Sequence, residues 1–246
     1  MDLTGKVALV TGAGQYVGLG IAKQLVDDGA TVLINDIHAD RAAEGVAAIE
    51  ATGGKAAACV FDVTSLDSVE TALAALPAEL ANVDILVNNA GNAGARDMPQ
   101  VAFKDMPTEH WDWYLGVNLM GVLNCTKAVI NGMTDRGWGR IITISSEAGR
   151  AGLNINVSIY GAAKAGAAHF MRHLSHEVGP LGVTANTVSL GLMNNVPDEF
   201  SGPMIKTIPT RRLGSPEDVG DAVSYLAGAD WVSGQTIVVN GGSQAF

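Results

Sequence analysis

The sequence is poor in cysteine and in basic residues, and it has no long apolar run. Its two cysteines, Cys59 and Cys125, stand apart in apolar surroundings, so they provide neither a disulfide framework nor a thiolate metal site. Lysine and arginine number 15 against 25 acidic residues, and nucleic acid or an anionic membrane would repel the resulting net charge of −10. No apolar stretch approaches the roughly 18 residues of a membrane-spanning helix, and no basic segment followed by an apolar one opens the chain. We therefore expect a cytoplasmic protein whose partners include neither nucleic acid nor a membrane.

Apolar strands and helices alternate along the 246 residues without a linker or an internal repeat. This predicts an α/β fold in a single domain, with a doubly wound parallel sheet of about seven strands and helices on both faces. Strands are expected at 7–10, 31–36, 55–61, 84–91, 139–146, 183–190 and 235–240. Helices are expected after the first strand, at 40–51, from 64–67, at 108–133 (extended or kinked), at 158–179 and from 215–218. Two segments without a clear pattern, 92–107 and 191–213, are interpreted as substrate loops, although a plain surface excursion explains the first about as well.

A Gly-rich turn follows the first strand, in the segment that runs from Thr11 to Gly20. Glycines permit a tight turn, and the helix that follows offers free N–H groups to a pyrophosphate, as in the Rossmann fold. The next strand ends in Asp36, whose carboxylate can accept both hydroxyls of an adenosine ribose and would repel a 2′-phosphate. Ile37 follows, and the Gly-rich loop has no Arg or Lys, which favours NAD over NADP. An ordinary Gly-rich turn and a solvent-facing acid are the structural alternatives.

Tyr160 and Lys164 lie four residues apart in an Ala-rich segment, so their side chains should share one helix face. A lysine ammonium favours the phenolate and would lower the pKa of the tyrosine from about 10 toward neutrality. Tyr160 would then serve as a proton donor and acceptor. Ser146 ends a buried strand, at the edge of a parallel sheet where ligands bind. The spacing Tyr-x-x-x-Lys alone is weak evidence, since it occurs by chance on many helices.

Taken in order, these residues resemble the short-chain dehydrogenase/reductase family over essentially the whole chain. The resemblance rests on Thr11-Gly12 with Gly18, Asp36, Asp62-Val63, Asn88-Asn89-Ala90-Gly91, Asn118, Ser146, Tyr160 with Lys164, and Asn186. It implies that Tyr160 exchanges a proton with the substrate oxygen while a hydride moves between the substrate and the nicotinamide. Lys164 would lower the tyrosine pKa and hold the nicotinamide ribose, and Ser146 would orient the reacting oxygen. Asn118 would position a water in a proton relay, unless its amide only satisfies helix backbone.

The resemblance also implies a set of residues that contact the NAD cofactor. These are Gly12, Gln15, Tyr16, Val17, Gly18, Asp36, Ile37, Asp62, Val63, Asn89, Ala90, Gly91, Tyr160, Lys164, Gly191 and Met193. The implied substrate pocket contains Ser146, Leu153, Tyr160, Leu192 and Met193, and Ile155, Val196 and Phe200 would add to its apolar wall.

The chain departs from the family pattern at three positions. Tyr16 stands where the family has a glycine, and we expect its backbone to lie near the pyrophosphate with its ring turned outward. Leu190-Gly191 replaces a Pro-Gly pair, which predicts a less rigid loop. Asn195 replaces a threonine that often contacts the cofactor carboxamide, and its amide can both donate and accept.

Three histidines, His169, His173 and His176, share one edge of the helix at 158–179. Their spacing would suit a metal, but no partner acid is evident and they lie off the face of Tyr160 and Lys164, so we expect no metal site. In the family this helix usually packs against a neighbouring subunit, which implies a homotetramer or homodimer. The terminal pair Ala245-Phe246 is expected to contribute to that interface.

The resemblance and the residues together predict an NAD-dependent oxidoreductase that acts reversibly on a hydrophobic secondary alcohol or ketone, a small-molecule substrate. One alternative is an NADPH-dependent reductase of 3-oxoacyl groups on an acyl carrier protein. Asp36, the acidic surface, and Leu181 and Gly137 in place of basic residues speak against it. A second alternative, a non-catalytic protein that only senses the cofactor, is disfavoured by the intact set of Asn118, Ser146, Tyr160 and Lys164.

Overall fold

A computed structural model describes residues 1–92, 98, 100–195 and 198–244. Seven strands form one sheet in the order β3-β2-β1-β4-β5-β6-β7, and every pairing is parallel. The strands are β1 (Val7–Val10), β2 (Thr31–Ile34), β3 (Ala56–Ala58), β4 (Ile85–Asn88), β5 (Gly139–Ser146), β6 (Val183–Leu190) and β7 (Thr236–Val239). The helices are α1 (Tyr16–Asp27), α2 (Ala39–Glu50), α3 (Leu66–Ala74), α4 (Glu109–Leu115), α5 (Gly121–Asp135), α6 (Ser158–Val178), α7 (Asp198–Thr207) and α8 (Pro216–Gly228). The predicted doubly wound Rossmann fold is confirmed.

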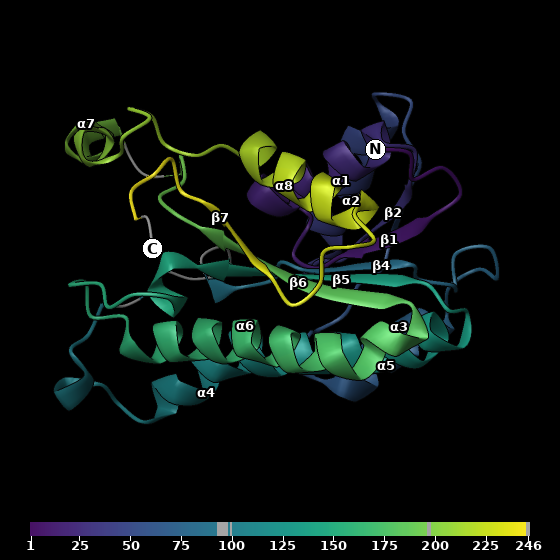
Figure 1. Ribbon diagram of the computed structural model, residues 1–246, viewed down its shortest axis with the longest axis horizontal. Coiled ribbons are helices and arrows are strands. Elements are labelled where there is room, and N and C mark those ends of the chain that lie inside the picture. The colour runs from purple at the N-terminus through teal and green to yellow at the C-terminus, as the bar shows by residue number, and fades with distance from the viewer. Residues whose placement is uncertain (93–97, 99, 196–197, 245–246) are drawn as a thin grey trace.

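Two hydrophobic cores cover the two faces of the sheet. Helices α1, α2 and α8 lie on one face and α3 to α6 on the other (Figure 1). The central strands β1, β4, β5 and β6 are almost entirely buried, as expected for a sheet covered on both sides. Their carboxyl ends therefore meet along one edge, where a ligand can bind.

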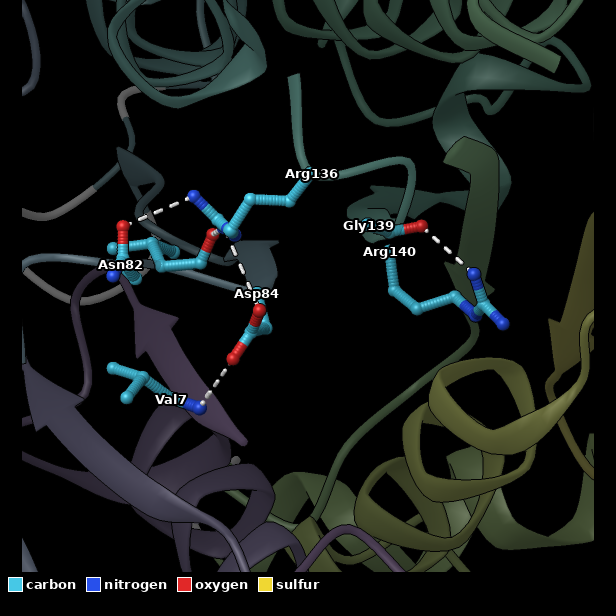
Figure 2. A network of polar contacts seen from close by, with 7 residues as sticks. Val7, Asn82, Asp84, Arg136, Gly139 and Arg140 are labelled. Carbon is cyan, nitrogen blue, oxygen red and sulfur yellow. Dashed lines mark hydrogen bonds and ion pairs between the residues drawn. The ribbon is translucent and has the colours of Figure 1, made fainter. Parts of the chain in front are cut away.

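Polar contacts join the amino ends of the strands, at the edge opposite the ligand-binding edge. Asp84 accepts a hydrogen bond from the backbone N–H of Val7, 3.1 Å away, and forms an ion pair with Arg136 (Figure 2). Arg136 also donates to the side chain of Asn82 and to the carbonyl of Val83. These contacts link β1, the start of β4 and the end of α5, so they fix the positions of β1 and β4 relative to each other along the strand direction.

The segment predicted as one long helix at 108–133 is divided into α4, a π-helical turn at Gly116–Met120, and α5. A π turn inserts one extra residue into a helix, and such turns occur often at functional sites. Asn118 lies in this turn and donates a hydrogen bond to the carbonyl of Tyr114. The predicted helical segment is therefore present from Glu109 to Asp135, with a π-helical turn inside it.

Two predicted boundaries need correction. The strand expected at 55–61 is confined to Ala56–Ala58 because the side chain of Asn35 takes the carbonyls of Cys59 and Phe61 as hydrogen-bond acceptors. The loop expected at 191–213 contains α7, which the sequence did not indicate because Pro203 lies inside it and its apolar residues are few. Residues 93–97 and 99 of the expected loop at 92–107 lie outside the described residues, as do Val196, Ala245, Phe246 and the side chain of Phe200. Among the helices described, none has the length and apolarity needed to cross a membrane.

Candidate active site

One cavity of about 470 Å³ opens along the carboxyl ends of the strands. It is lined by the Gly-rich loop, the ends of β2, β4 and β5, the first turns of α6 and the segment after β6. The residues of the predicted cofactor and substrate sets that line this cavity are Gly12, Gln15, Tyr16, Val17, Gly18, Asp36, Ile37, Asp62, Val63, Asn89, Ala90, Gly91, Ser146, Leu153, Ile155, Tyr160, Lys164, Gly191, Leu192 and Met193. Its size is typical of a site for a small molecule or cofactor.

The Gly-rich loop packs too closely on its neighbours to carry side chains at two points. A Cβ on Gly18 would lie 2.4 Å from the Gly12 carbonyl oxygen, and one on Gly12 would lie 3.0 Å from the Cα of Ala90. The side chain of Asn89 donates to the carbonyls of Thr11 and Gly12, and the Thr11 hydroxyl accepts from the N–H groups of Asn89 and Ala90. The end of β4 therefore holds the loop in place over the start of α1.

The end of β2 presents Asp36, which is 5% exposed. Its carboxylate accepts a hydrogen bond from the backbone N–H of His38, 3.0 Å away, which fixes its orientation. Asn35, the preceding residue, accepts from the N–H of Gly12 and so connects the acid to the Gly-rich loop. Arg41 also lines the cavity, and its backbone lies against Gly14.

Ser146, Tyr160 and Lys164 meet at the junction of β5 and α6. A Cβ on Gly161 would lie 2.6 Å from the carbonyl oxygen of Ala148, so α6 approaches the turn after β5 as closely as backbone allows. The Ser145 hydroxyl donates to the Lys164 carbonyl across this junction. The Lys164 Nζ donates to the carbonyl of Ile144, 2.9 Å away, and lies 5.8 Å from the centroid of the Tyr160 ring.

Burial governs the ionisation of both groups. It lowers the pKa of Lys164 to about 8, because the ammonium loses its hydration. Burial also raises the pKa of Tyr160, and a hydrogen bond with Ser146 opposes this rise. The expectation that Lys164 brings the tyrosine pKa down is therefore wrong: desolvation of the phenolate raises this pKa by more than the hydrogen bond with Ser146 lowers it.

Asn118 does not line the cavity but lies just behind it. Its amide nitrogen donates to the side chain of Asn92 and to the carbonyl of Tyr114, whereas its buried Oδ1 has no hydrogen-bond partner. A methyl group on Gly91 would lie 3.1 Å from this Oδ1 and 3.5 Å from the Lys164 Nζ. The amide thus satisfies backbone through its nitrogen and keeps an acceptor directed toward the neighbourhood of Lys164.

The Tyr16 ring does not turn outward, contrary to the prediction. Tyr16 begins α1 with a φ of 48°, in the left-handed region, and its side chain is half-buried. Its hydroxyl donates to Oδ1 of Asn194, 2.6 Å away, in the segment that follows β6. The left-handed backbone gives the side chain a different direction from that of an ordinary helical residue.

The segment after β6 begins under close restraint. Gly191 donates to the carbonyl of Val239, and a Cβ on Gly191 would lie 2.7 Å from that of Asn240. Leu192, Met193 and Asn195 line the cavity.

The sequence model for short chain dehydrogenases matches residues 6–199. The chain belongs to the short-chain dehydrogenase family. It is 35% identical over 250 residues to the 7alpha-hydroxysteroid dehydrogenase of Escherichia coli K12, covering 98% of this chain and 95% of that protein. It is 39% identical over 249 residues to the 3-oxoacyl-[acyl-carrier-protein] reductase FabG of Pseudomonas aeruginosa, covering 98% of both. As a short-chain dehydrogenase, the protein is an oxidoreductase that acts on an alcohol or the corresponding ketone.

The fold of this short-chain dehydrogenase is also found among solved structures. A gluconate 5-dehydrogenase from Burkholderia cenocepacia J2315, in complex with NADP and tartrate, superposes with a TM-score of 0.90. The two chains are 30% identical, and the match covers 98% of this chain and 96% of the other.

Sequence reasoning missed two charged residues that line the cavity of this short-chain dehydrogenase. Arg41 belongs to α2 and gave no signal beyond its distance from Asp36. Glu147 directly follows Ser146, is 8% exposed, and accepts hydrogen bonds from the side chains of Asn240 and Ser243. The position of Glu147 directly after Ser146, at the carboxyl end of β5, was the signal that could have identified it.

The histidines of α6 lie outside the cavity. His169 and His173 are exposed, and their Nε2 atoms are 3.2 Å apart. Across the described part of the chain, no group of three or more His, Cys, Asp or Glu side chains is placed to hold a metal ion.

Proposed function

We propose that this short-chain dehydrogenase transfers a hydride reversibly between NAD and a hydrophobic secondary alcohol or its ketone. The observation that carries the proposal is that Ser146, Tyr160 and Lys164 line the same cavity as the Gly-rich loop and Asp36. A proton donor, an oxygen-binding hydroxyl and a dinucleotide-binding loop are the groups that carbonyl reduction needs.

The residues present fit a bound nicotinamide dinucleotide. Gly12 and Gly18 line the cavity, so a pyrophosphate can approach the backbone of the loop there. The first turn of α1 carries no acidic residue, and Gln15 does not cap it, so its N–H groups keep their positive potential. Asp36 suits the ribose hydroxyls, and Lys164 suits the ribose next to the nicotinamide. When bound, the cofactor supplies the hydride donor or acceptor.

The side chains perform the proton transfer. In reduction, Tyr160 donates its hydroxyl proton to the carbonyl oxygen while Ser146 donates a hydrogen bond to that same oxygen. In oxidation, Tyr160 takes the proton back. Lys164, whose pKa is lowered to about 8, exchanges protons readily at neutral to mildly basic pH. Asn118, with its unpartnered Oδ1, is placed to hold a water that returns the proton.

The cofactor preference depends on two opposing charges. Asp36 is buried and held by the N–H of His38, so a 2′-phosphate beside it would be repelled. Arg41 lines the same cavity and would attract that phosphate. We expect the repulsion by Asp36 to exceed the attraction by Arg41, because the Asp36 carboxylate is fixed whereas an arginine side chain can turn toward solvent.

Titration of the purified protein with NADH and, in parallel, NADPH tests this preference by following the fluorescence of the reduced nicotinamide. NADH should bind roughly tenfold or more tightly than NADPH, since a charge pair a few ångströms apart accounts for that much. Asp36→Ala should reverse the order, and Asp40→Ala, which removes an exposed acid of α2, should not. Tighter binding of NADPH by the unaltered protein would refute the NAD assignment.

A second candidate is an NADPH-dependent 3-oxoacyl reductase. It is supported by the similarity to the FabG proteins and by the position of Arg41. Turnover of a 3-oxoacyl pantetheine thioester with NADPH, faster than that of any hydrophobic secondary alcohol with NAD, would favour it. In either case Tyr160→Phe should abolish turnover and leave cofactor affinity unchanged, whereas a protein that only senses the cofactor would show no turnover to lose.

A further inference from the structure

Tyr16 occupies a backbone conformation that side chains usually avoid. Its φ of 48° is in the left-handed region, and of the described residues only Asn156 and Arg211 share this feature without being glycine. Strained residues of this kind persist where the surrounding structure holds them, and they concentrate at ligand-binding sites. Here the surrounding structure includes the far wall of the cavity.

The phenol of Tyr16 reaches that wall through a hydrogen bond. Its hydroxyl donates to Oδ1 of Asn194 at 2.6 Å. Burial raises the pKa of this phenol to about 12, so the hydroxyl keeps its proton and its role as donor across the physiological range. Tyr16 and Asn194 are 178 residues apart in sequence, and Tyr16 lines the cavity together with Met193 and Asn195, the two neighbours of Asn194.

The partner segment is anchored to the rest of the fold. Asn194 donates through its backbone N–H to the carbonyl of Gly214, and Gly214 donates to the carbonyl of Leu192, each at 2.9 Å. Met193 and Gly214 form a bridge of parallel β type. Asn194 is therefore not at the tip of a free loop, and a displacement of Asn194 would also displace the chain immediately before α8.

We propose that the Tyr16 side chain is a positioning residue that ties the Gly-rich loop to Asn194 across the cofactor cavity and slows release of the bound dinucleotide. The proposal rests on the proposed function, since it takes the ligand to be a nicotinamide dinucleotide. The tie joins the start of α1, where the pyrophosphate binds, to the segment 192–195, which lines the cavity beyond β6. The hydrogen bond from Tyr16 to Asn194 resists separation of these two walls, and a dinucleotide bound between them is therefore released more slowly.

The dissociation rate of NADH, measured by stopped-flow displacement with excess NAD, tests the tie. Tyr16→Phe removes only the hydroxyl and keeps the ring, so dissociation should accelerate about five- to tenfold, as expected for the loss of one hydrogen bond. Asn194→Ala should give a similar acceleration. The double variant should release NADH no faster than the quicker single variant, because both changes break the same contact. Tyr225→Phe, on the exposed surface of α8, serves as the matched control and should leave the rate unchanged.

Hydrogen exchange of the ligand-free protein provides a readout that does not depend on the cofactor. Tyr16→Phe should speed exchange at the amides of Asn194 and Asn195, while the amides of β5 keep their protection. Unchanged dissociation and unchanged exchange in Tyr16→Phe, or additive effects in the double variant, would overturn the tie. If the unaltered protein binds neither NADH nor NADPH, the proposed function fails instead, and the exchange experiment still decides whether the tie exists.

Discussion

Lys164 is a charged group held where water hardly reaches it. Burial lowers its pKa from 10.5 to about 8, which corresponds to roughly 3 kcal/mol of stability lost at neutral pH. Its hydrogen bond to the Ile144 carbonyl returns part of that energy. A lysine that served the fold alone would be better placed at the surface, so its position is explained by the ligand and by Tyr160.

The sign of this effect fixes a pH dependence. Below pH 8 the folded and unfolded states both hold the proton, and the full penalty applies. Between pH 8 and 10.5 the unfolded state binds more protons than the folded one, so this group makes stability rise with pH. Lys164→Met should therefore stabilise the protein by about 1–3 kcal/mol at pH 7, a difference that shrinks toward pH 10, while turnover is lost. Urea denaturation of both proteins at pH 7, 8, 9 and 10 measures it, and a variant less stable than the parent at pH 7 would contradict it.

The residues of the cavity could be predicted where local backbone chemistry decides their position. A glycine at a close approach, an acid at the end of β2 and a serine at the end of β5 follow from strand and turn patterns alone. The direction of the Tyr16 ring could not be predicted. It depends on the backbone angle φ, and a tyrosine at a position where the family has glycine does not reveal whether φ is positive or negative. Arg41 was missed because its access to the cavity depends on how α2 packs on the sheet. Glu147 was missed because its position depends on contacts with Asn240 and Ser243, near the end of the chain.

At the scale of elements, the placement of α1 depends on its contact with α8. A Cβ on Gly20 would lie 2.4 Å from the Cβ of Pro216, and one on Gly220 would lie 2.9 Å from the Cβ of Gln24. The two helices thus pack through glycines. Helix α8 is itself well anchored, since Ser215 and Asp218 form a capping box and Asp218 pairs with Arg212. A change at Gly20 must therefore displace α1, whose first turn forms the phosphate site.

Gly20→Ala should destabilise the fold by about 1–3 kcal/mol through overpacking and should weaken NADH binding as the start of α1 shifts. Gly202→Ala is the matched control, because a Cβ at this position in α7 meets nothing within 4 Å. That change should be neutral or stabilise by up to about 1 kcal/mol through helix propensity. Thermal unfolding and NADH titration of the two variants compare them, and equal stability would show that α1 and α8 adjust without strain.

Helices and strands could be predicted from the sequence where the spacing of apolar residues was regular and where capping residues marked the helix ends. Strands β5 and β6 matched their predicted bounds because each is rich in β-branched residues and begins at or directly after a glycine. Helix α7 could not be predicted, because the segment contains Pro203 and has too few apolar residues to indicate a helical pattern. The π turn at Gly116–Met120 could be anticipated only as a kink, since it results from the packing of Asn118 rather than from a breaking residue.

At the scale of the whole molecule, the two edges of the sheet differ. The edge strand β3 consists of three alanines, whereas β7 presents Ile237, Val238 and Val239, all only half-buried. Next to β7, Trp231 is 95% exposed, and Tyr225 of α8 is 46% exposed. An uncovered strand edge beside a large exposed aromatic favours association with another chain. The family resemblance implies a homotetramer or homodimer, and this edge is where we expect one contact.

Trp231 should be buried between subunits in such an assembly. We expect the unaltered protein to elute as a dimer or tetramer in size-exclusion chromatography with light scattering, and Trp231→Ser to shift it toward a smaller species. Val60→Ser, near the opposite edge of the sheet and 40% exposed, should leave the mass unchanged. The β7 edge would be dismissed as a contact if Trp231→Ser kept the parent mass.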